Sequence, residues 1–149
     1  MKGRKDKNGK DWSGLGKKKI MIVDNEKEIV EKLKVFFERN INYEVLGLTD
    51  SRETLSKVHS FRPDVIILDL LMPHLGGLEV CEQLNDDEIG RATPIIITSA
   101  LCKNIDKLKA FKLGIVSYFV KPIELEMLIV AIKNALSFKE KLDEQTFKN

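Results

Sequence analysis

Short apolar runs alternate along this chain with stretches in which apolar residues recur every three or four positions. The runs predict buried β-strands, because consecutive branched side chains suit a sheet that is covered on both faces. The expected strands are residues 20–23, 43–48, 64–68, 94–98 and 116–120. The intervening stretches predict amphipathic helices at residues 26–39, 53–60, 78–85, 104–113 and 124–138. Five strands, each followed by a helix, predict an α/β fold with a doubly wound, five-stranded parallel sheet.

Polar side chains stand where four of the expected strands end. Asp24 and Asn25 follow the first strand, and Asp69 follows the third. Ser99 follows the fourth strand and Lys121 the fifth. Because functional groups in open parallel sheets gather beyond the carboxyl ends of the strands, we expect these side chains to share one rim.

This set of side chains suits phosphoryl chemistry. The carboxylates of Asp24 and Asp69, with a further oxygen ligand, match the donors that Mg²⁺ prefers. A carboxylate such as that of Asp69 is also able to act as a nucleophile and form an aspartyl phosphate. Lys121 and Ser99 supply donors for the phosphoryl oxygens, and phosphoryl transfer depends mainly on positioning and charge neutralisation.

Composition is typical of a water-soluble single domain. The 149 residues, 43% hydrophobic and 32% charged, suffice for one sizeable core. No apolar run approaches the roughly 18–20 residues that cross a bilayer, and the N-terminus has no apolar signal segment. Cys81 and Cys102 lack the spacing of metal ligands, which favours a reducing, cytoplasmic setting.

Charge is distributed unevenly along the chain. Residues 1–19 carry eight basic and two acidic side chains, a formal charge of +6, whereas the remaining 130 residues carry −4. We therefore expect residues 1–17 to be a basic, disordered leader, residues 18–138 the folded domain, and residues 139–149 a tail or an extension of the last helix. Trp12 is the one aromatic residue of the leader, so nucleic-acid binding is not expected.

Four motifs make the sequence similar to the receiver domains of bacterial two-component response regulators. They are IMIVDNE (20–26), DVIILDLLMP (64–73), PIIITSA (94–100) and YFVKP (118–122), in the order and at the spacings of that family. The resemblance covers roughly residues 18–138. It implies a flavodoxin-like fold with strand order 2-1-3-4-5 and five flanking helices.

The resemblance also implies roles for the polar residues at the strand ends. Asp69 would accept a phosphoryl group from a phosphohistidine, and Lys121 and Ser99 would contact the phosphoryl oxygens. Tyr118 matches the aromatic residue that moves inward together with the Ser99 side chain in the switch; a fixed core aromatic is the alternative. The Lys121–Pro122 peptide bond is expected to be cis.

Mg²⁺ would be held, by the same resemblance, by Asp24, Asn25, Asp69 and the backbone carbonyl of Leu71. The family normally has a second carboxylate where this chain has Asn25, an amide that coordinates a metal without bringing charge. We therefore expect weaker Mg²⁺ binding, with Glu26 as a water-mediated helper, but not loss of function. No other cofactor is implied.

Two apolar residues flank the expected path of the water that hydrolyses the acyl phosphate. Leu71 lies two positions after Asp69, and Leu101 lies two positions after Ser99. Neither leucine side chain is able to orient a nucleophilic water, so slow self-dephosphorylation is expected.

The leading hypothesis is a phosphorylation-activated signalling switch rather than an enzyme, with a sensor histidine kinase or a histidine phosphotransfer protein as donor. Only 11 residues follow residue 138, so we expect output through protein contacts. The partner would be a downstream target, or a second copy in a homodimer through residues 104–113, 116–120 and 124–138. The alternative is a phosphorylation-independent pseudo-receiver, a protein-binding module, which Asn25 favours and the intact Asp69, Ser99 and Lys121 disfavour.

Two further classes of protein with this fold fit less well. An aspartyl-phosphate phosphatase needs an acid at the position of Leu71. A flavin or nucleotide binder needs a phosphate-cradling glycine loop after the first strand, where this chain has the acidic sequence DNEKE.

Overall fold

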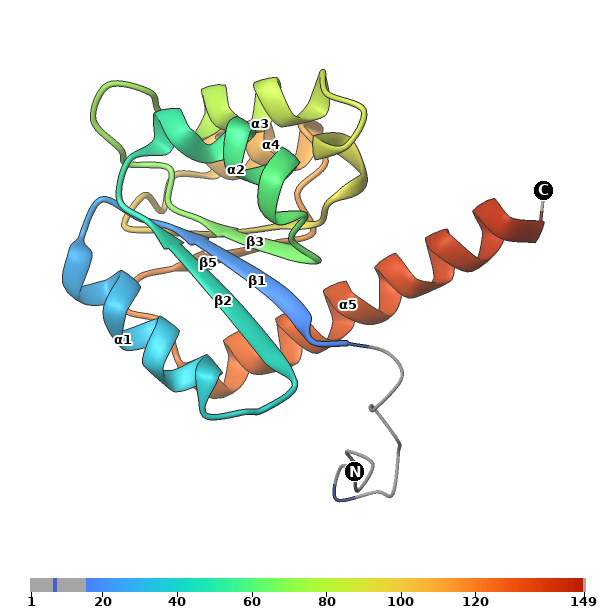
Figure 1. Ribbon diagram of the computed structural model, residues 1–149. Coiled ribbons are helices and arrows are strands. Elements are labelled where there is room, and N and C mark those ends of the chain that lie inside the picture. The colour runs from blue at the N-terminus through green and yellow to red at the C-terminus, as the bar shows by residue number, and fades with distance from the viewer. Residues whose placement is uncertain (1–6, 8–15, 149) are drawn as a thin grey trace.

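The computed structural model describes residue 7 and residues 16–148, and these form a parallel sheet between two layers of helices (Figure 1). The strands are β1 Lys18–Val23, β2 Tyr43–Leu48, β3 Val65–Leu68, β4 Ile95–Ser99 and β5 Ser117–Val120. The helices are α1 Lys27–Glu38, α2 Thr54–Phe61, α3 Gly77–Asn85, α4 Asn104–Lys112 and α5 Leu125–Lys148. Short 3₁₀ helices at Ser51–Glu53 and Gly90–Ala92 precede α2 and β4. Most of the expected leader, residues 1–17, lies outside the described residues.

The strand order β2-β1-β3-β4-β5, with every pairing parallel, confirms the predicted doubly wound fold. The chain passes from β1 to β2 and then returns across β1 to β3, so the order reverses between β1 and β3. At that point Val23, the last residue of β1, pairs with Leu68, the last residue of β3. Asp24 and Asp69 therefore leave the sheet from adjacent positions.

Alternate residues of the central strands face the two helical layers. Ile20 and Ile22 of β1 pack in the cluster formed with α1 and α5, whereas Met21 and Val23 pack in the cluster formed with α2, α3 and α4. Figure 1 shows the same division, with α1 and α5 on one side of the sheet. Because both faces are covered, the strands are apolar along nearly their whole length, as the sequence pattern predicts.

The element boundaries differ from the predicted ones by one or two residues at several places. β1 begins at Lys18 because its pairing with β2 continues past the apolar run, with Lys18 opposite Tyr43. β4 begins after Pro94, which has no N–H for the ladder, and it includes Ser99. In the part of the chain that the structure describes, no helix is both long and apolar enough to cross a membrane.

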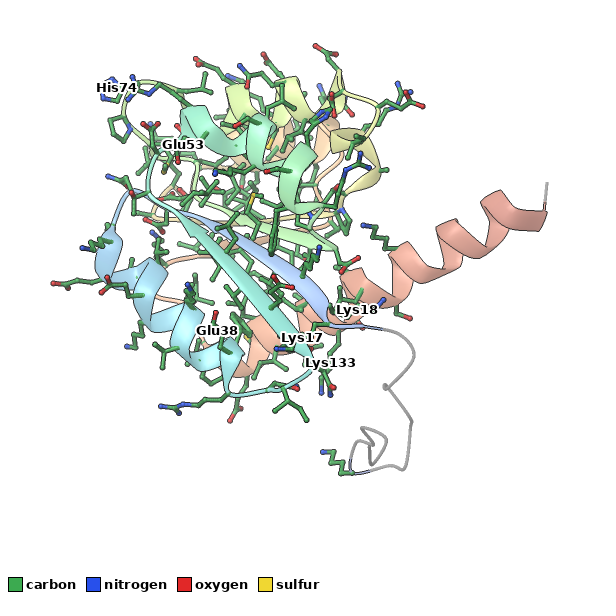
Figure 2. All side chains as sticks on the ribbon, in the orientation of Figure 1. Lys17, Lys18, Glu38, Glu53, His74 and Lys133 are labelled. Atoms are coloured by element: carbon green, nitrogen blue, oxygen red, sulfur yellow. The ribbon has the colours of Figure 1, made fainter. Side chains whose placement is uncertain are left out.

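The end of the sheet where β1 and β3 begin is joined to α5 by a cluster that we call the basal cluster: Lys19, Asp64 and Lys139. The Asp64 carboxylate accepts the Lys19 backbone N–H at 2.8 Å and lies 3.4 Å from the Lys139 amine. The Lys139 amine also donates to the carbonyl of Pro63 at 3.2 Å. In Figure 2, Lys18 marks this end of the sheet, and His74 lies at the other end, on the loop between β3 and α3.

Candidate functional site

The candidate site lies beyond the carboxyl ends of β1, β3, β4 and β5. The sheet ladder continues for one residue past two of these strands. The N–H of Asp24 donates to Leu48 at 3.1 Å, and the N–H of Asp69 donates to Val23 at 3.0 Å. Continued pairing holds both acids against the core, so their carboxylates are almost completely buried.

Lys121 supplies the positive charge that these buried carboxylates need. Its amine lies 2.7 Å from Oδ2 of Asp24 and 3.2 Å from Oδ2 of Asp69. Burial lowers the pKa of the Lys121 amine, but the hydrogen bond and charge of Asp24, followed by those of Asp69, outweigh this and raise it. The group therefore stays an ammonium, and the formal charges of the three side chains sum to −1.

The other oxygen of each carboxylate is bound by the loop that follows it. Oδ1 of Asp24 accepts the N–H of Glu26 at 2.9 Å, and Oδ1 of Asp69 accepts the N–H of Leu71 at 3.0 Å. Each aspartate thus closes a short turn with the residue two positions later. These turns fix the carboxylates, because a backbone donor and an ammonium hold each one in place.

Two backbone features bring the start of α3 close behind Asp69. His74 adopts a φ of 68°, a left-handed conformation that non-glycine residues rarely take. Gly77 packs so closely against the backbone of Asp69 and Leu70 that a Cβ atom would overlap it. The glycine is required here for close approach.

Ser99 is the last residue of β4, and Tyr118 lies on the neighbouring strand β5. Ser99 is fully buried, and its hydroxyl accepts the N–H of Leu101 at 3.3 Å. The backbone carbonyl of Ser99 accepts the N–H of Lys121 at 2.8 Å, so the register of β4 and β5 places these two residues next to each other. The Lys121–Pro122 peptide bond is cis, as the resemblance implies.

The half-buried Tyr118 donates from its hydroxyl to the carbonyl of Leu101 at 2.8 Å. The amine of Lys107, on α4, lies 5.8 Å from the centre of its ring. Burial, followed by the charge of Asp106, raises the pKa of Tyr118, and a hydrogen bond with Ser99 opposes the rise. The ring therefore links β5 to the β4–α4 loop; whether it moves as a switch stays a prediction.

Asn25 is exposed and lines a polar hollow of about 420 Å³. The other residues around this hollow come from α1, the β2–α2 loop and the β3–α3 loop: Lys27, Thr49, Asp50, Arg52, Pro73 and His74. Leu71, two residues after Asp69, is 48% exposed. Close to each buried aspartate in the chain, the structure therefore exposes an uncharged residue, Asn25 or Leu71.

The donor chemistry of the site fits Mg²⁺. Among the side chains that the structure describes, no group of three or more His, Cys, Asp or Glu is placed to hold a metal ion. Mg²⁺, however, is commonly held by one or two carboxylates together with waters and neutral oxygens. Asp24 and Asp69 supply the carboxylates here, while Asn25 and the carbonyl of Leu71 remain the predicted neutral ligands.

Sequence reasoning missed two features around the site. The resemblance assigned Lys121 to phosphoryl oxygens, whereas in the structure its amine lies between the two carboxylates. The buried hydroxyl of Ser51 donates to the carbonyl of Leu75 and ties the β2–α2 loop to the β3–α3 loop. Neither contact leaves a local signal, because each joins residues that are far apart in the chain.

Comparison with known proteins agrees with this fold and this arrangement of strand-end side chains. The family model of the response regulator receiver domain matches residues 20–133. The chain belongs to this family. As the four motifs predict, the matched residues are a receiver domain of the type found in two-component signalling proteins.

Named relatives and solved structures support the same assignment. The chain is 35% identical over 123 residues to the alkaline phosphatase synthesis transcriptional regulatory protein PhoP of Bacillus subtilis, covering 83% of this chain and 50% of PhoP. It is 35% identical over 118 residues to response regulator ArlR of Staphylococcus saprophyticus, covering 79% and 52% of the two chains. This receiver domain spans about half the length of these curated relatives.

The solved structures match over nearly their whole length. The receiver domain of the Francisella response regulator 1452 is 30% identical with a TM-score of 0.74, and the match covers 80% of this chain and 97% of that one. A response regulator receiver domain protein from Clostridium thermocellum is also 30% identical, with a TM-score of 0.75 and coverage of 84% and 98%.

Proposed function

We propose that this receiver domain is a phosphorylation-dependent switch that accepts a phosphoryl group on Asp69 with Mg²⁺ bound. The donor is a phosphohistidine of a sensor kinase or of a histidine phosphotransfer protein in the cytoplasm. The domain promotes only its own phosphorylation and its slow dephosphorylation, and it has no separate enzymatic substrate.

One observation carries the proposal: two buried carboxylates, from Asp24 and Asp69, share a single ammonium from Lys121. A site that served only stability would balance these charges or replace them with apolar side chains. The excess negative charge suits a divalent cation, and the retained ammonium suits the oxygens of a phosphoryl group.

In the transfer, an oxygen of the Asp69 carboxylate forms a bond to phosphorus while the phosphorus–nitrogen bond of the phosphohistidine breaks. The imidazole leaves with the electron pair of that bond, and the product is an acyl phosphate. Mg²⁺, when bound, offsets the negative charge that the carboxylates and the phosphoryl group bring together. Lys121 then pairs with a phosphoryl oxygen, and the buried Ser99 hydroxyl donates to another.

Incubation with acetyl phosphate and Mg²⁺, followed by intact-mass measurement, tests this proposal without any partner protein. We expect wild type to gain the mass of one phosphoryl group and the Asp69→Asn variant to gain none. The Asp64→Asn variant, altered in the basal cluster, serves as the matched control and should be labelled like wild type.

The second candidate is a pseudo-receiver that binds a partner without phosphorylation, and the neutral Asn25 is the feature that favours it. In that case wild type would keep its unmodified mass under all conditions of the labelling experiment. Labelling that persists in Asp69→Asn would also overturn the proposal, because it would place the phosphoryl group elsewhere.

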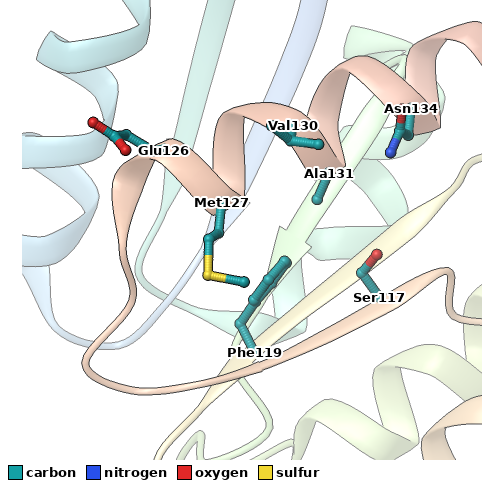
Figure 3. A pocket seen from close by; sticks show the side chains of 7 residues that line it. All are labelled: Ser117, Phe119, Glu126, Met127, Val130, Ala131 and Asn134. Atoms are coloured by element: carbon teal, nitrogen blue, oxygen red, sulfur yellow. The ribbon is translucent and has the colours of Figure 1, made fainter.

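We further propose that output passes through protein contacts at α4, β5 and α5. On α4, Ile105, Leu108 and Phe111 are about half exposed. On α5, Met127 and Val130 are also about half exposed and line an apolar hollow of about 410 Å³, where Met127 faces Phe119 of β5 (Figure 3). Exposed apolar side chains on the two helices that precede and follow the edge strand β5 suit an interaction surface.

Either a downstream target or a second copy of the chain would occupy this surface. Sedimentation velocity with and without acetyl phosphate distinguishes the two. A phosphorylation-dependent dimer that Val130→Glu abolishes supports the homodimer. A monomer in both states leaves the downstream target as the partner.

A further inference from the structure

Three carboxylates surround the amine of Lys121. Besides Asp24 at 2.7 Å and Asp69 at 3.2 Å, Oε1 of Glu26 lies 3.8 Å away. The three differ strongly in exposure: the side chains of Asp24 and Asp69 are 3% and 4% exposed, and that of Glu26 is 60% exposed. Two of the partners are fixed in the core, and the third stands in solvent at the entrance.

Each oxygen of the two buried carboxylates already accepts a hydrogen bond from the protein itself. Oδ1 of each is bound by a backbone N–H, and Oδ2 of each faces the Lys121 amine. A cation that enters between Asp24 and Asp69 therefore competes with the lysine. The same holds for an attack by Asp69 on phosphorus, because the Lys121 amine covers one of its two oxygens.

Glu26 has the properties of an alternative partner for that amine. Its backbone is anchored because its N–H donates to Asp24, and it lies directly before the first turn of α1. Its side chain is long, flexible and mostly solvated, so it reaches toward Lys121 or withdraws at little cost. The carboxylate is already within ion-pair distance of the amine.

We propose that Glu26 is a positioning residue that takes over the Lys121 ammonium when Asp24 and Asp69 bind the cation and the phosphoryl group. This inference rests on the proposed function. By pairing with Lys121, Glu26 lowers the free-energy cost of separating its ammonium from the two aspartates. It also keeps the ammonium at the opening of the site, where a phosphoryl oxygen arrives. The device matters in this chain because Asn25 adds no charge to compete with Lys121.

Mg²⁺ binding without any phosphate donor tests this role. In an NMR titration, the amide signal of Leu71 reports on the site because this N–H is bound to Asp69. We expect Glu26→Gln to weaken Mg²⁺ binding by about two- to five-fold, the range that one partly exposed ion pair supplies. Glu28→Gln, which removes a carboxylate of the same charge two residues further along, in the first turn of α1, should bind Mg²⁺ like wild type.

Two further variants separate positioning of Lys121 from a simple effect of negative charge. Glu26→Asp keeps the charge but shortens the side chain, so it should behave like Glu26→Gln. In the Lys121→Met background, adding Glu26→Gln should change Mg²⁺ affinity no further. Circular dichroism confirms that the Lys121→Met variants are folded before they are compared.

Several outcomes would overturn the inference. They are unchanged Mg²⁺ affinity in Glu26→Gln, wild-type affinity in Glu26→Asp, or an equal loss from Glu26→Gln with and without Lys121. Because the titration uses no phosphate donor, its outcome is independent of the labelling of Asp69. A failure of the inference is therefore distinguishable from a failure of the proposed function.

Discussion

The two ends of the sheet both join lysine to aspartate, but they balance charge in opposite ways. At the carboxyl end of the strands, the nearly buried Asp24 and Asp69 share the one amine of Lys121. At the opposite end, in the basal cluster, a single carboxylate, that of Asp64, accepts hydrogen bonds from the Lys139 amine and from the backbone N–H of Lys19. The basal cluster also lies partly in solvent.

This difference separates a site kept for chemistry from a contact kept for stability. In the basal cluster the Asp64 carboxylate pairs with one ammonium, that of Lys139, and each of its two oxygens has a donor. The carboxyl end of the strands, which we call the acceptor end, also gives each carboxylate oxygen a donor, yet Asp24, Asp69 and Lys121 together retain one formal negative charge in a buried position. Such an excess costs folding free energy, and it persists where a ligand supplies the missing charge.

The largest expected effect comes from removing the lysine at each end. Lys121→Met should lower the free energy of unfolding by about 2–4 kcal/mol at neutral pH, because it leaves two buried carboxylates without a counter-charge. Lys139→Met should cost less than about 1 kcal/mol, because its partner remains solvated. Urea denaturation without Mg²⁺ measures both, and equal losses would contradict the comparison.

Restoring charge at the acceptor end should strengthen metal binding. Asn25→Asp adds the third carboxylate that the family normally has, and we expect it to tighten Mg²⁺ binding by about ten-fold, or about 1.4 kcal/mol. Calorimetric titration of Mg²⁺ measures the change. Tighter binding in wild type than in Asn25→Asp would show that the amide is not the weaker ligand.

Neutralising one aspartate at each end should have effects of opposite sign. Asp69→Asn leaves Asp24 and Lys121 as a balanced pair, and its amide oxygen still accepts the Leu71 N–H. The free energy of unfolding should therefore rise by about 1 kcal/mol. Asp64→Asn loses one of two acceptors in the basal cluster and should cost about 1 kcal/mol of stability. Thermal unfolding without Mg²⁺ tests both signs.

The sequence predicted which strand ends would meet, because acids that follow buried runs have no other place in a parallel sheet. Asp24 and Asp69 were found in this way. The contact of the Lys121 amine with both carboxylates was not predictable. The lysine lies 97 residues from Asp24, and the position of its amine depends on the turn before α5. Asp64 gave no signal either, since its partners come from β1 and from a late turn of α5.

The apolar rim of the acceptor end should govern how long the acyl phosphate survives. Leu71 is half exposed beside Asp69, and replacing it with Asn introduces a side chain that is able to orient a water. We expect Leu71→Asn to hydrolyse the acyl phosphate several-fold faster than wild type. Intact mass measured after removal of acetyl phosphate follows the decay; rapid decay in wild type, unchanged in Leu71→Asn, would show that the rim does not protect the bond.

The smallest effect concerns the pH range over which Lys121 stabilises the acceptor end. Asp24 and Asp69 raise the pKa of Lys121 above the ordinary 10.5, despite the larger single contribution of burial, which lowers it. A raised pKa in the folded state means that the ion pairs stabilise fully below the ordinary lysine pKa and are lost as pH rises through the folded value. The difference in unfolding free energy between wild type and Lys121→Met should therefore be constant from neutral pH upward and shrink only in strongly alkaline solution. Urea denaturation at a series of pH values measures this difference, and a decline that began below the ordinary lysine pKa would mean that burial, not the two carboxylates, controls the amine.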